Sequence, residues 1–133
     1  MRPCRWWWLV LWCVCVRSWA TPQLQCQFDL NGSRETHVFQ PVADPYRASS
    51  IDLGGRFRFK AVMLAAASQV ESVDLYVSYQ TRRQPMILQH VQFTQPVVDS
   101  QAKPDALTGR VALYSPFLGK ELQYGCSLYA VTP

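Results

Sequence analysis

The strongest constraint on the fold is an alternation of apolar and polar residues that recurs along the chain after residue 20. In residues 24–30, "LQCQFDL", apolar side chains occupy every second position, and Gln or Asp fills the positions between them. Successive side chains of a β-strand point to opposite faces of the sheet, so this period of two is typical of a strand with one buried face. The segment therefore predicts a half-buried strand in which Cys26 points toward the core.

The same period predicts further strands along the chain. They fall within residues 35–39, 56–66, 72–83, 85–93, 110–117 and 121–131. We expect Phe57, Phe59 and Cys126 to face the core. The alternation is imperfect in residues 85–93, so the inner face of that strand stays open. One side of this strand carries Ile87, Gln89, Val91 and Phe93, and the other side carries Met86, Leu88, His90 and Gln92.

The segments between these strands contain turn signals. Asn31-Gly32 is a favoured pair for a two-residue hairpin, because both positions tolerate a positive φ. Asn31 also begins an Asn-Gly-Ser acceptor, which makes it a candidate for N-glycosylation in a host that glycosylates. Residues 40–55 predict a long connection between sheets, and residues 95–109 predict a surface loop. Residues 65–69, "AAASQ", join two predicted strands either directly or through a short helical turn.

About seven short strands, regular turn signals and no convincing amphipathic helix predict an antiparallel sandwich of two sheets, immunoglobulin-like in general architecture. A small β-barrel is the alternative. The hallmarks of a true immunoglobulin domain are missing, because no Trp follows residue 20 and Cys26 and Cys126 are too far apart in the sequence. The pattern therefore predicts an architecture and no particular family.

Residues 1–20 predict a cleaved secretory signal peptide. Two arginines precede an apolar run at residues 6–16, and Ser18-Trp19-Ala20 places small residues at the two positions that matter for cleavage. The apolar run is too short to cross a bilayer, which requires about 20 residues. We expect residues 21–133 to form a single domain that is exported to a periplasmic or extracellular space and keeps no membrane span.

Removal of this segment changes the charge balance. Of the 13 basic residues, Arg2, Arg5 and Arg17 are lost, whereas all 9 acidic residues remain, which leaves a net charge of +1. A nearly neutral domain lacks the strongly basic surface that is typical of nucleic-acid-binding proteins. We therefore expect no nucleic-acid partner.

Two cysteines follow residue 20, Cys26 and Cys126. An even number of cysteines in an exported protein favours a disulfide, and both lie on the apolar faces of predicted strands. We expect a bridge between them in or beside the core, with two separate buried thiols as the alternative. Neither has the nearby Cys or His partner of a typical zinc site, so we expect no metal and no other cofactor.

Residues 54–66, "GGRFRFKAVMLAA", alternate positive charges with aromatic rings. Arg56, Arg58 and Lys60 are expected on the solvent side, and Arg82-Arg83 ends the next strand. If the two strands form a hairpin, Arg56 and Arg82-Arg83 lie at the same end and concentrate positive charge there. Two interpretations stay open: the charges keep the strand soluble, or they bind a partner.

The sequence offers few candidates for catalytic residues. The two histidines, His37 and His90, lie in no recognised catalytic or metal-binding context. The acidic residues are scattered singly along the sequence, so no local carboxylate pair or calcium loop is indicated. We therefore do not expect an enzyme.

These observations favour an exported, non-catalytic β-sandwich that binds another protein or an envelope component. The first alternative is a small secreted hydrolase, or an inhibitor of an enzyme, that uses His37 or His90. The second is a domain of a secreted viral or animal glycoprotein that is modified at Asn31. The identity of the partner and the oligomeric state stay open.

Overall fold

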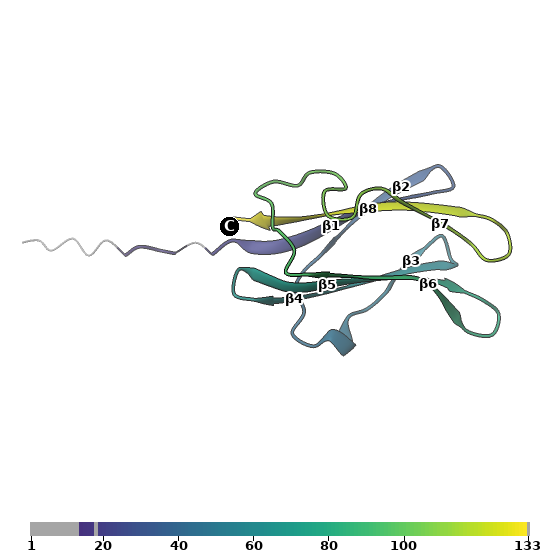
Figure 1. Cartoon of the computed structure of the whole chain (residues 1–133), viewed down its shortest axis with the longest axis horizontal. Coiled ribbons are helices and arrows are strands. Elements are labelled where there is room, and N and C mark those ends of the chain that lie inside the picture. Colours follow the sequence, from purple (N-terminus) through teal and green to yellow (C-terminus); the bar gives the residue numbers. More distant parts are fainter. Residues whose placement is uncertain (1–13, 18, 133) are drawn as a thin grey trace, which may run out of the picture.

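The computed structural model describes residues 14–17 and 19–132, and their strands form two antiparallel sheets that face each other (Figure 1). Sheet A contains, in spatial order, β2 (Ser33–Phe39), β1 (Thr21–Leu30), β8 (Glu121–Val131) and β7 (Val111–Tyr114). Sheet B contains β3 (Ile51–Leu53), β4 (Phe57–Ala66), β5 (Gln69–Gln80) and β6 (Pro85–Thr94). The two-sheet sandwich predicted from the sequence is confirmed.

The order of strands in the sheets follows the order along the chain almost throughout. Each pair of neighbours is consecutive in sequence except β1 and β8, which join the first strand to the last. An immunoglobulin constant domain instead combines non-consecutive strands in both sheets. The resemblance to immunoglobulins is therefore confined to the two packed antiparallel sheets.

The strands match the predicted segments except at two ends and for one addition. Strand β5 ends at Gln80, so Arg82 and Arg83 lie in the following hairpin loop and not at the end of the strand as predicted. Strand β7 ends at Tyr114, so residues 115–117, which were predicted as strand, belong to the loop that follows.

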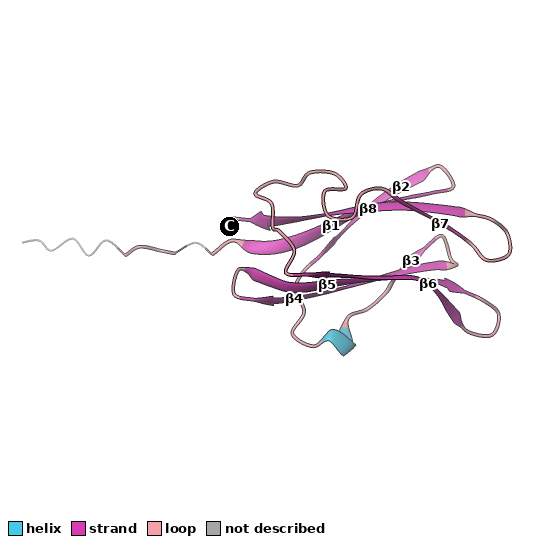
Figure 2. Ribbon diagram, viewed as in Figure 1, coloured by secondary structure: helices cyan, strands magenta, loops and turns pink. Residues whose placement is uncertain are grey.

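Residues 40–55 do cross from sheet A to sheet B, but they also contain the short strand β3 and a 3-10 helix, η1 (Pro45–Arg47) (Figure 2). The flanking residues, Gly54 and Gly55, have positive φ angles of 66° and 84°, which allow a tight turn from β3 into β4. No alternation is visible in a strand of three residues, so the sequence pattern missed it.

The predicted hairpins are present. Asn31 and Gly32 both have positive φ angles, 53° and 79°, and join β1 to β2 in the two-residue turn that the sequence indicates. Residues 65–69 contain no helix, because Ala66 pairs with Gln69 and the chain turns through Ala67 and Ser68. Of the two expectations for this segment, the direct connection is correct.

The core lies between the sheets and consists of the inward faces of β1, β4, β5 and β8. Its fully buried large side chains include Phe28, Phe59, Leu75, Leu122 and Tyr124. The rings of Phe28 and Phe59 meet edge to face with centroids 4.7 Å apart, which joins β1 to β4 across the core. Tyr124 adds a polar link between the sheets, since its hydroxyl donates a hydrogen bond to Gln89 Oε1 on β6.

The predicted disulfide is confirmed. Cys26 and Cys126 lie directly opposite each other on β1 and β8, with Cα atoms 4.1 Å apart, and both are fully buried. The bridge therefore joins neighbouring strands within sheet A and does not connect the two sheets. Its two residues are 100 positions apart in sequence, so it closes almost the whole described domain into one loop.

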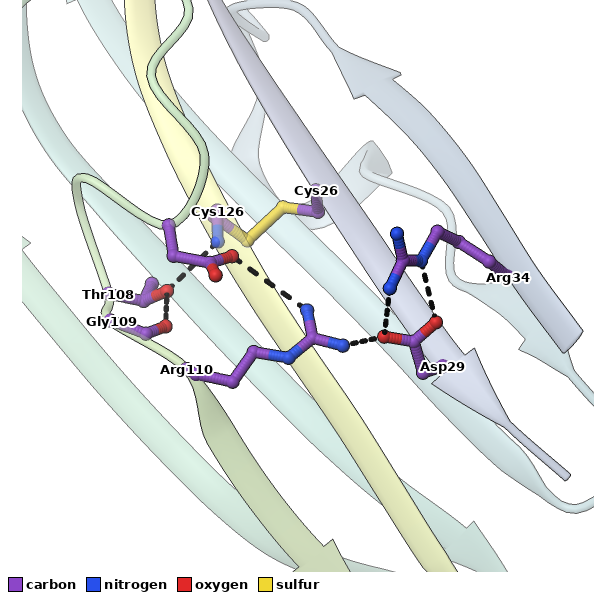
Figure 3. Close-up of polar contacts among 8 residues, drawn as sticks. Cys26, Asp29, Arg34, Thr108, Gly109, Arg110 and Cys126 are labelled. Atoms are coloured by element: carbon purple, nitrogen blue, oxygen red, sulfur yellow. Dashed lines mark hydrogen bonds and ion pairs between the residues drawn. A yellow bond between two sulfur atoms is a disulfide. The ribbon is translucent and has the colours of Figure 1, made fainter. Parts of the chain in front are cut away.

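The outer face of sheet A is tied to residues 95–110 by polar contacts (Figure 3). Thr108 Oγ1 accepts a hydrogen bond from the backbone N–H of Cys126 at 2.9 Å. Arg110 forms ion pairs with Asp29 on β1 and Asp105, and Asp29 also binds Arg34 on β2 at 2.8 Å. A side chain at Gly125 would overlap the Asp105 carboxylate, so glycine lets the loop lie against β8.

The predicted signal peptide falls mainly on residues 1–13 and 18, which lie outside the described residues. Strand β1 begins at Thr21, directly after the predicted cleavage position. Cleavage and the assignment of residues 21–133 to one mature domain stay predictions.

Loss of the disulfide is expected to destabilise the domain strongly. In the chain-entropy model a loop of about 100 residues contributes up to about 4 to 5 kcal/mol, comparable to the whole stability of a small domain. We expect the Cys26→Ala/Cys126→Ala variant to unfold at a much lower urea concentration than the oxidised wild type. Reduction of the wild type should give the same shift, and an unchanged midpoint in both experiments would contradict a stabilising role.

Ionisation of Tyr124 is expected to weaken the fold at high pH. Burial raises the pKa of Tyr124 to about 12, whereas a tyrosine in an unfolded chain ionises near pH 10. Between these values the unfolded state holds fewer protons than the folded state, so the free energy of unfolding falls as pH rises, by about 2 to 3 kcal/mol over the full window. Urea denaturation between about pH 9 and 11 should show a smaller fall for Tyr124→Phe. The matched variant Tyr46→Phe, at a residue that is 92% exposed, should behave like the wild type.

Candidate functional site

The basic residues predicted from the sequence lie around one corner of sheet B, in two adjoining hollows. The larger hollow, which we call the end cleft, has a volume of about 880 Å³. It lies between the β5–β6 hairpin and the β7–β8 loop, and the residues that line it include Arg56, Arg82, Arg83, Met86, Ile87, Phe117 and Leu118. The other predicted cations, Arg58 and Lys60, line a smaller hollow of about 310 Å³ on the outer face of sheet B. Pro85 and Ile87 belong to both, so the two hollows form one continuous surface.

Arg56 is held at the end cleft by the turn between β3 and β4. Its carbonyl accepts a hydrogen bond from the N–H of Gln80 at 2.8 Å, and its Nη1 donates to the carbonyl of Gln80 at 3.5 Å. These contacts fix the turn against the last residue of β5, beside the hairpin that carries Arg82 and Arg83. Glycine suits this turn because Gly54 has a positive φ angle, and a side chain at this position would also require the end of the Leu30 side chain to move.

Arg82 and Arg83 occupy the centre of the β5–β6 hairpin, which Thr81 organises. The Thr81 hydroxyl donates to the carbonyl of Gln84 at 2.6 Å and accepts from the N–H groups of Arg83 and Gln84 at 3.3 and 3.2 Å. A hydroxyl that binds backbone groups in this way closes a tight turn. Both arginine side chains are therefore presented from a constrained turn.

Met86 and Ile87 reach the end cleft because β6 contains a β-bulge. Val77 pairs with Gln89, but its neighbour Ser78 pairs with Ile87, so Leu88 is an extra residue in the ladder. A bulge of this kind shifts the alternation by one position. Ile87 therefore shares the outer face with His90, whereas Gln89, Val91 and Phe93 face the other sheet. The expectation that Ile87 lies on the same side as Gln89 is wrong, and the bulge is the physical reason.

The opposite wall of the end cleft comes from the loop between β7 and β8. Ser115 closes this loop, since its N–H donates to the carbonyl of Lys120 at 2.8 Å and its Oγ accepts from the N–H of Lys120 at 2.9 Å. Phe117 and Leu118 project from the loop and are 76% and 70% exposed.

The alternation placed Phe117 at the end of a strand predicted over residues 110–117, and this placement is wrong because β7 ends at Tyr114. The signal for a turn was Pro116 and Gly119 around the two large apolar residues.

The cations of this surface form no salt bridge with the acidic residues that the structure describes, although Asp52 is the cross-strand neighbour of Arg58. Within residues 14–17 and 19–132, every salt bridge of 4.0 Å or less involves Arg34, Arg47, Arg110, His37 or His90. None involves the five residues predicted as a basic patch. Their positive charges are therefore available to an anionic group brought by another molecule.

A row of polar and aromatic side chains crosses the outer face of sheet B next to this surface. Lys60, Tyr76 and His90 are cross-strand neighbours on β4, β5 and β6. The rings of Tyr76 and His90 stack with centroids 4.3 Å apart, and Lys60 Nζ lies 6.0 Å from the centre of the Tyr76 ring. His90 Nε2 is 3.1 Å from Asp74 Oδ1. Stacking and pairing both hold this histidine in place.

The two histidines do not form one site. His90 lies on β6 in sheet B, whereas His37 lies on β2 in sheet A and contacts Glu35 at 3.2 Å. Among the described residues, Asp74 is the hydrogen-bond partner of His90, and no serine, threonine or cysteine side chain is hydrogen-bonded to either ring. In the same part of the chain, no cluster of three or more His, Cys, Asp or Glu side chains is arranged to hold a metal ion.

The helical content of the described chain is limited to η1, and none of its helices has the length and apolar character needed to cross a membrane. No protein-family model matches the sequence, and neither curated proteins nor solved structures match it significantly. The geometry of the end cleft and its surroundings is therefore the basis on which a function is inferred.

Proposed function

We propose that this protein is an exported, non-catalytic β-sandwich that binds another protein through the end cleft. The observation that carries this proposal is one concave surface that combines four exposed apolar side chains with three arginines that form no salt bridge within residues 14–17 and 19–132. Protein interfaces are enriched in aromatic residues, Met and Arg, and their energetic centres often combine an apolar anchor with an arginine. Phe117 and Arg82-Arg83 supply this combination from opposite walls.

The openness of the cleft favours a macromolecular partner over a small ligand. Sites for small molecules bury about 70 to 90% of the ligand surface in a lined cavity. Here Met86, Ile87, Phe117 and Leu118 are 41 to 76% exposed, so their side chains project toward solvent and do not enclose a volume. Apolar side chains exposed in this way contribute binding free energy when a large partner covers them and removes their surface from water.

Export is supported by the cysteines and the predicted signal peptide. A buried disulfide such as Cys26–Cys126 persists in oxidising compartments and is rare in the cytosol. A periplasmic or extracellular location is consistent with this chemistry, and an envelope component bound at the same surface is the closest alternative to a soluble protein partner.

A hydrolase or an enzyme inhibitor is the second candidate, since His90 and Asp74 form a histidine–carboxylate pair on an exposed face. Nucleophilic catalysis also requires a hydroxyl or thiol within hydrogen-bond reach of the histidine. Because no such group is hydrogen-bonded to His90 among the described residues, we favour binding. A hydrolytic activity that disappears in the His37→Ala/His90→Ala variant would reverse this preference. For the glycoprotein alternative, Asn31 is exposed in its turn, and a mass shift on enzymatic deglycosylation would support it.

The binding proposal can be tested by site-specific photo-crosslinking with the full oxidised protein. The photoreactive residue p-benzoylphenylalanine is placed at Phe117 and the protein is irradiated in extract from its own source. We expect one dominant adduct, because an interface partner contacts the cleft reproducibly. The control carries the same residue at Tyr46, an aromatic position that is 92% exposed and lies on η1. Equal adduct patterns from both positions would contradict a specific site.

Removal of their positive charges tests whether Arg82 and Arg83 contribute to binding of the partner. We expect Arg82→Ala/Arg83→Ala to lower the yield of the Phe117 adduct by about tenfold or more, since loss of a central interface arginine commonly costs over 1 kcal/mol. The matched variant Arg47→Ala/Lys103→Ala removes two positive charges outside both hollows and should leave the yield unchanged. An equal loss in both variants would point to net charge alone.

A further inference from the structure

Strand β6 is an unusual edge strand. It has ten residues and none of them is Asp, Glu, Lys or Arg. The other edges of the described sheets are short or charged: β3 has three residues, β7 has four, and β2 carries Arg34 and Glu35. Proteins normally protect long exposed edges with charge, Pro, a β-bulge or a covering segment, because an uncovered edge pairs readily with another chain. Strand β6 has Pro85 and the bulge at Leu88, but both lie in its first half and leave residues 89–94 without such protection.

The backbone of β6 is also uncovered on its outer side. Strand β6 pairs with β5 alone, and within residues 14–17 and 19–132 no loop forms backbone hydrogen bonds to its free edge. The edge of β8 is treated differently. Beyond β7 it receives backbone hydrogen bonds from Leu107 at 2.9 Å and from Asp99 at 3.0 Å. The fold thus covers the edge beyond β7 and leaves the backbone of residues 89–94 in β6 open.

The open edge leads directly into the end cleft. Pro85, Met86 and Ile87 begin β6 and also line the cleft, beside Arg82 and Arg83. A chain that paired along β6 would therefore bring its end, or a side chain near its end, between the arginines and the apolar wall formed by Phe117 and Leu118. Edge pairing supplies main-chain hydrogen bonds, and the cleft supplies selectivity for side chains.

We propose that the partner engages this protein with an extended polypeptide segment that adds to sheet B beside β6 and places a carboxylate and an apolar side chain in the end cleft. This inference rests on the proposed function and specifies the chemistry of its partner. The carboxylate pairs with Arg56, Arg82 and Arg83, and the apolar side chain packs between Met86 and Phe117. The carboxylate is either the C-terminus of the segment or an Asp or Glu side chain within it.

A second copy of this chain fits the same surface less well. In two copies that paired through β6, the pairing strand itself would bring no carboxylate to the arginines of the cleft. A carboxylate from a different polypeptide satisfies these charges. Charge complementarity therefore favours a heterologous acidic segment over self-association.

The test uses peptides selected from a phage-displayed library of random 12-residue sequences, with the full oxidised protein as bait. We expect selection of extended sequences that combine acidic and apolar residues, and reduced hydrogen exchange at the amides of β6 when they bind. The Arg82→Ala/Arg83→Ala variant should bind the synthetic peptide with an affinity at least about tenfold lower, and the Arg47→Ala/Lys103→Ala variant should bind it with unchanged affinity. Two changes to the peptide distinguish the sources of the carboxylate. Amidation of the C-terminus should weaken binding if the C-terminal carboxylate enters the cleft, and Asp→Asn or Glu→Gln replacement should weaken it if a side-chain carboxylate does.

N-methylation of the peptide backbone tests strand addition without altering the protein. Because alternate N–H groups of an added strand point toward β6, methylation of one alternating set should abolish binding and methylation of the other set should be tolerated. The proposal is overturned if no peptide is selected, if methylation of either set changes the affinity equally, or if the amides of β6 gain no protection from hydrogen exchange. A stable dimer in sedimentation that protects β6, or preferential binding to phosphatidylglycerol vesicles, would overturn it as well.

These outcomes separate this proposal from the general one. If photo-crosslinking at Phe117 captures a partner but peptides show no alternating N-methyl effect, the cleft binds protein by another mode and only strand addition fails. If neither the adduct nor the peptides appear, both proposals fail.

Discussion

The pairing of β1 with β8, sealed by the Cys26–Cys126 disulfide, is the contact on which the rest of the structure depends. It is the one strand pair in the described domain that is not made by consecutive strands, so it alone joins the beginning of the fold to its end. Closing such a long loop costs chain entropy, and the bridge removes much of that cost from the folding equilibrium. With β1 and β8 in place, their inward faces provide Phe28, Leu122 and Tyr124, against which sheet B packs.

The alternation of residues predicted the parts of the fold where one face of a strand is buried. For β1, β4 and β8 it correctly turned Cys26, Phe57, Phe59 and Cys126 toward the core, because a shift by one position would turn Phe59 to solvent. The prediction was incomplete at β3, which is too short to show a period, and incorrect for Ile87 in β6. Whether a β-bulge forms depends on how a strand fits its neighbour and on the packing around it, and residues 85–93 alone do not determine it.

The candidate site was predictable in part for the same reason. Arg56 and Arg82-Arg83 come from turns that adjoin once β4 and β5 form a hairpin, which the local pattern indicates. Phe117 and Leu118 come from a loop of the other sheet. Their place opposite β6 depends on how the sheets are stacked, and stacking is set by the whole core. Sequence reasoning therefore found the charges of the cleft and missed its apolar wall.

The position of the disulfide also determines how the domain responds to tension. The N-terminal end of β1 and the C-terminal end of β8 lie side by side, with Thr21 opposite Val131, and the bridge follows five residues further along the pair. A pulling force applied to these two ends opens the ladder only as far as Cys26 and Cys126, where a covalent bond takes the load. Sheet B, the hairpins and the end cleft all lie inside the closed loop and carry no tension. A partner bound at β6 would stay attached while the two ends are strained.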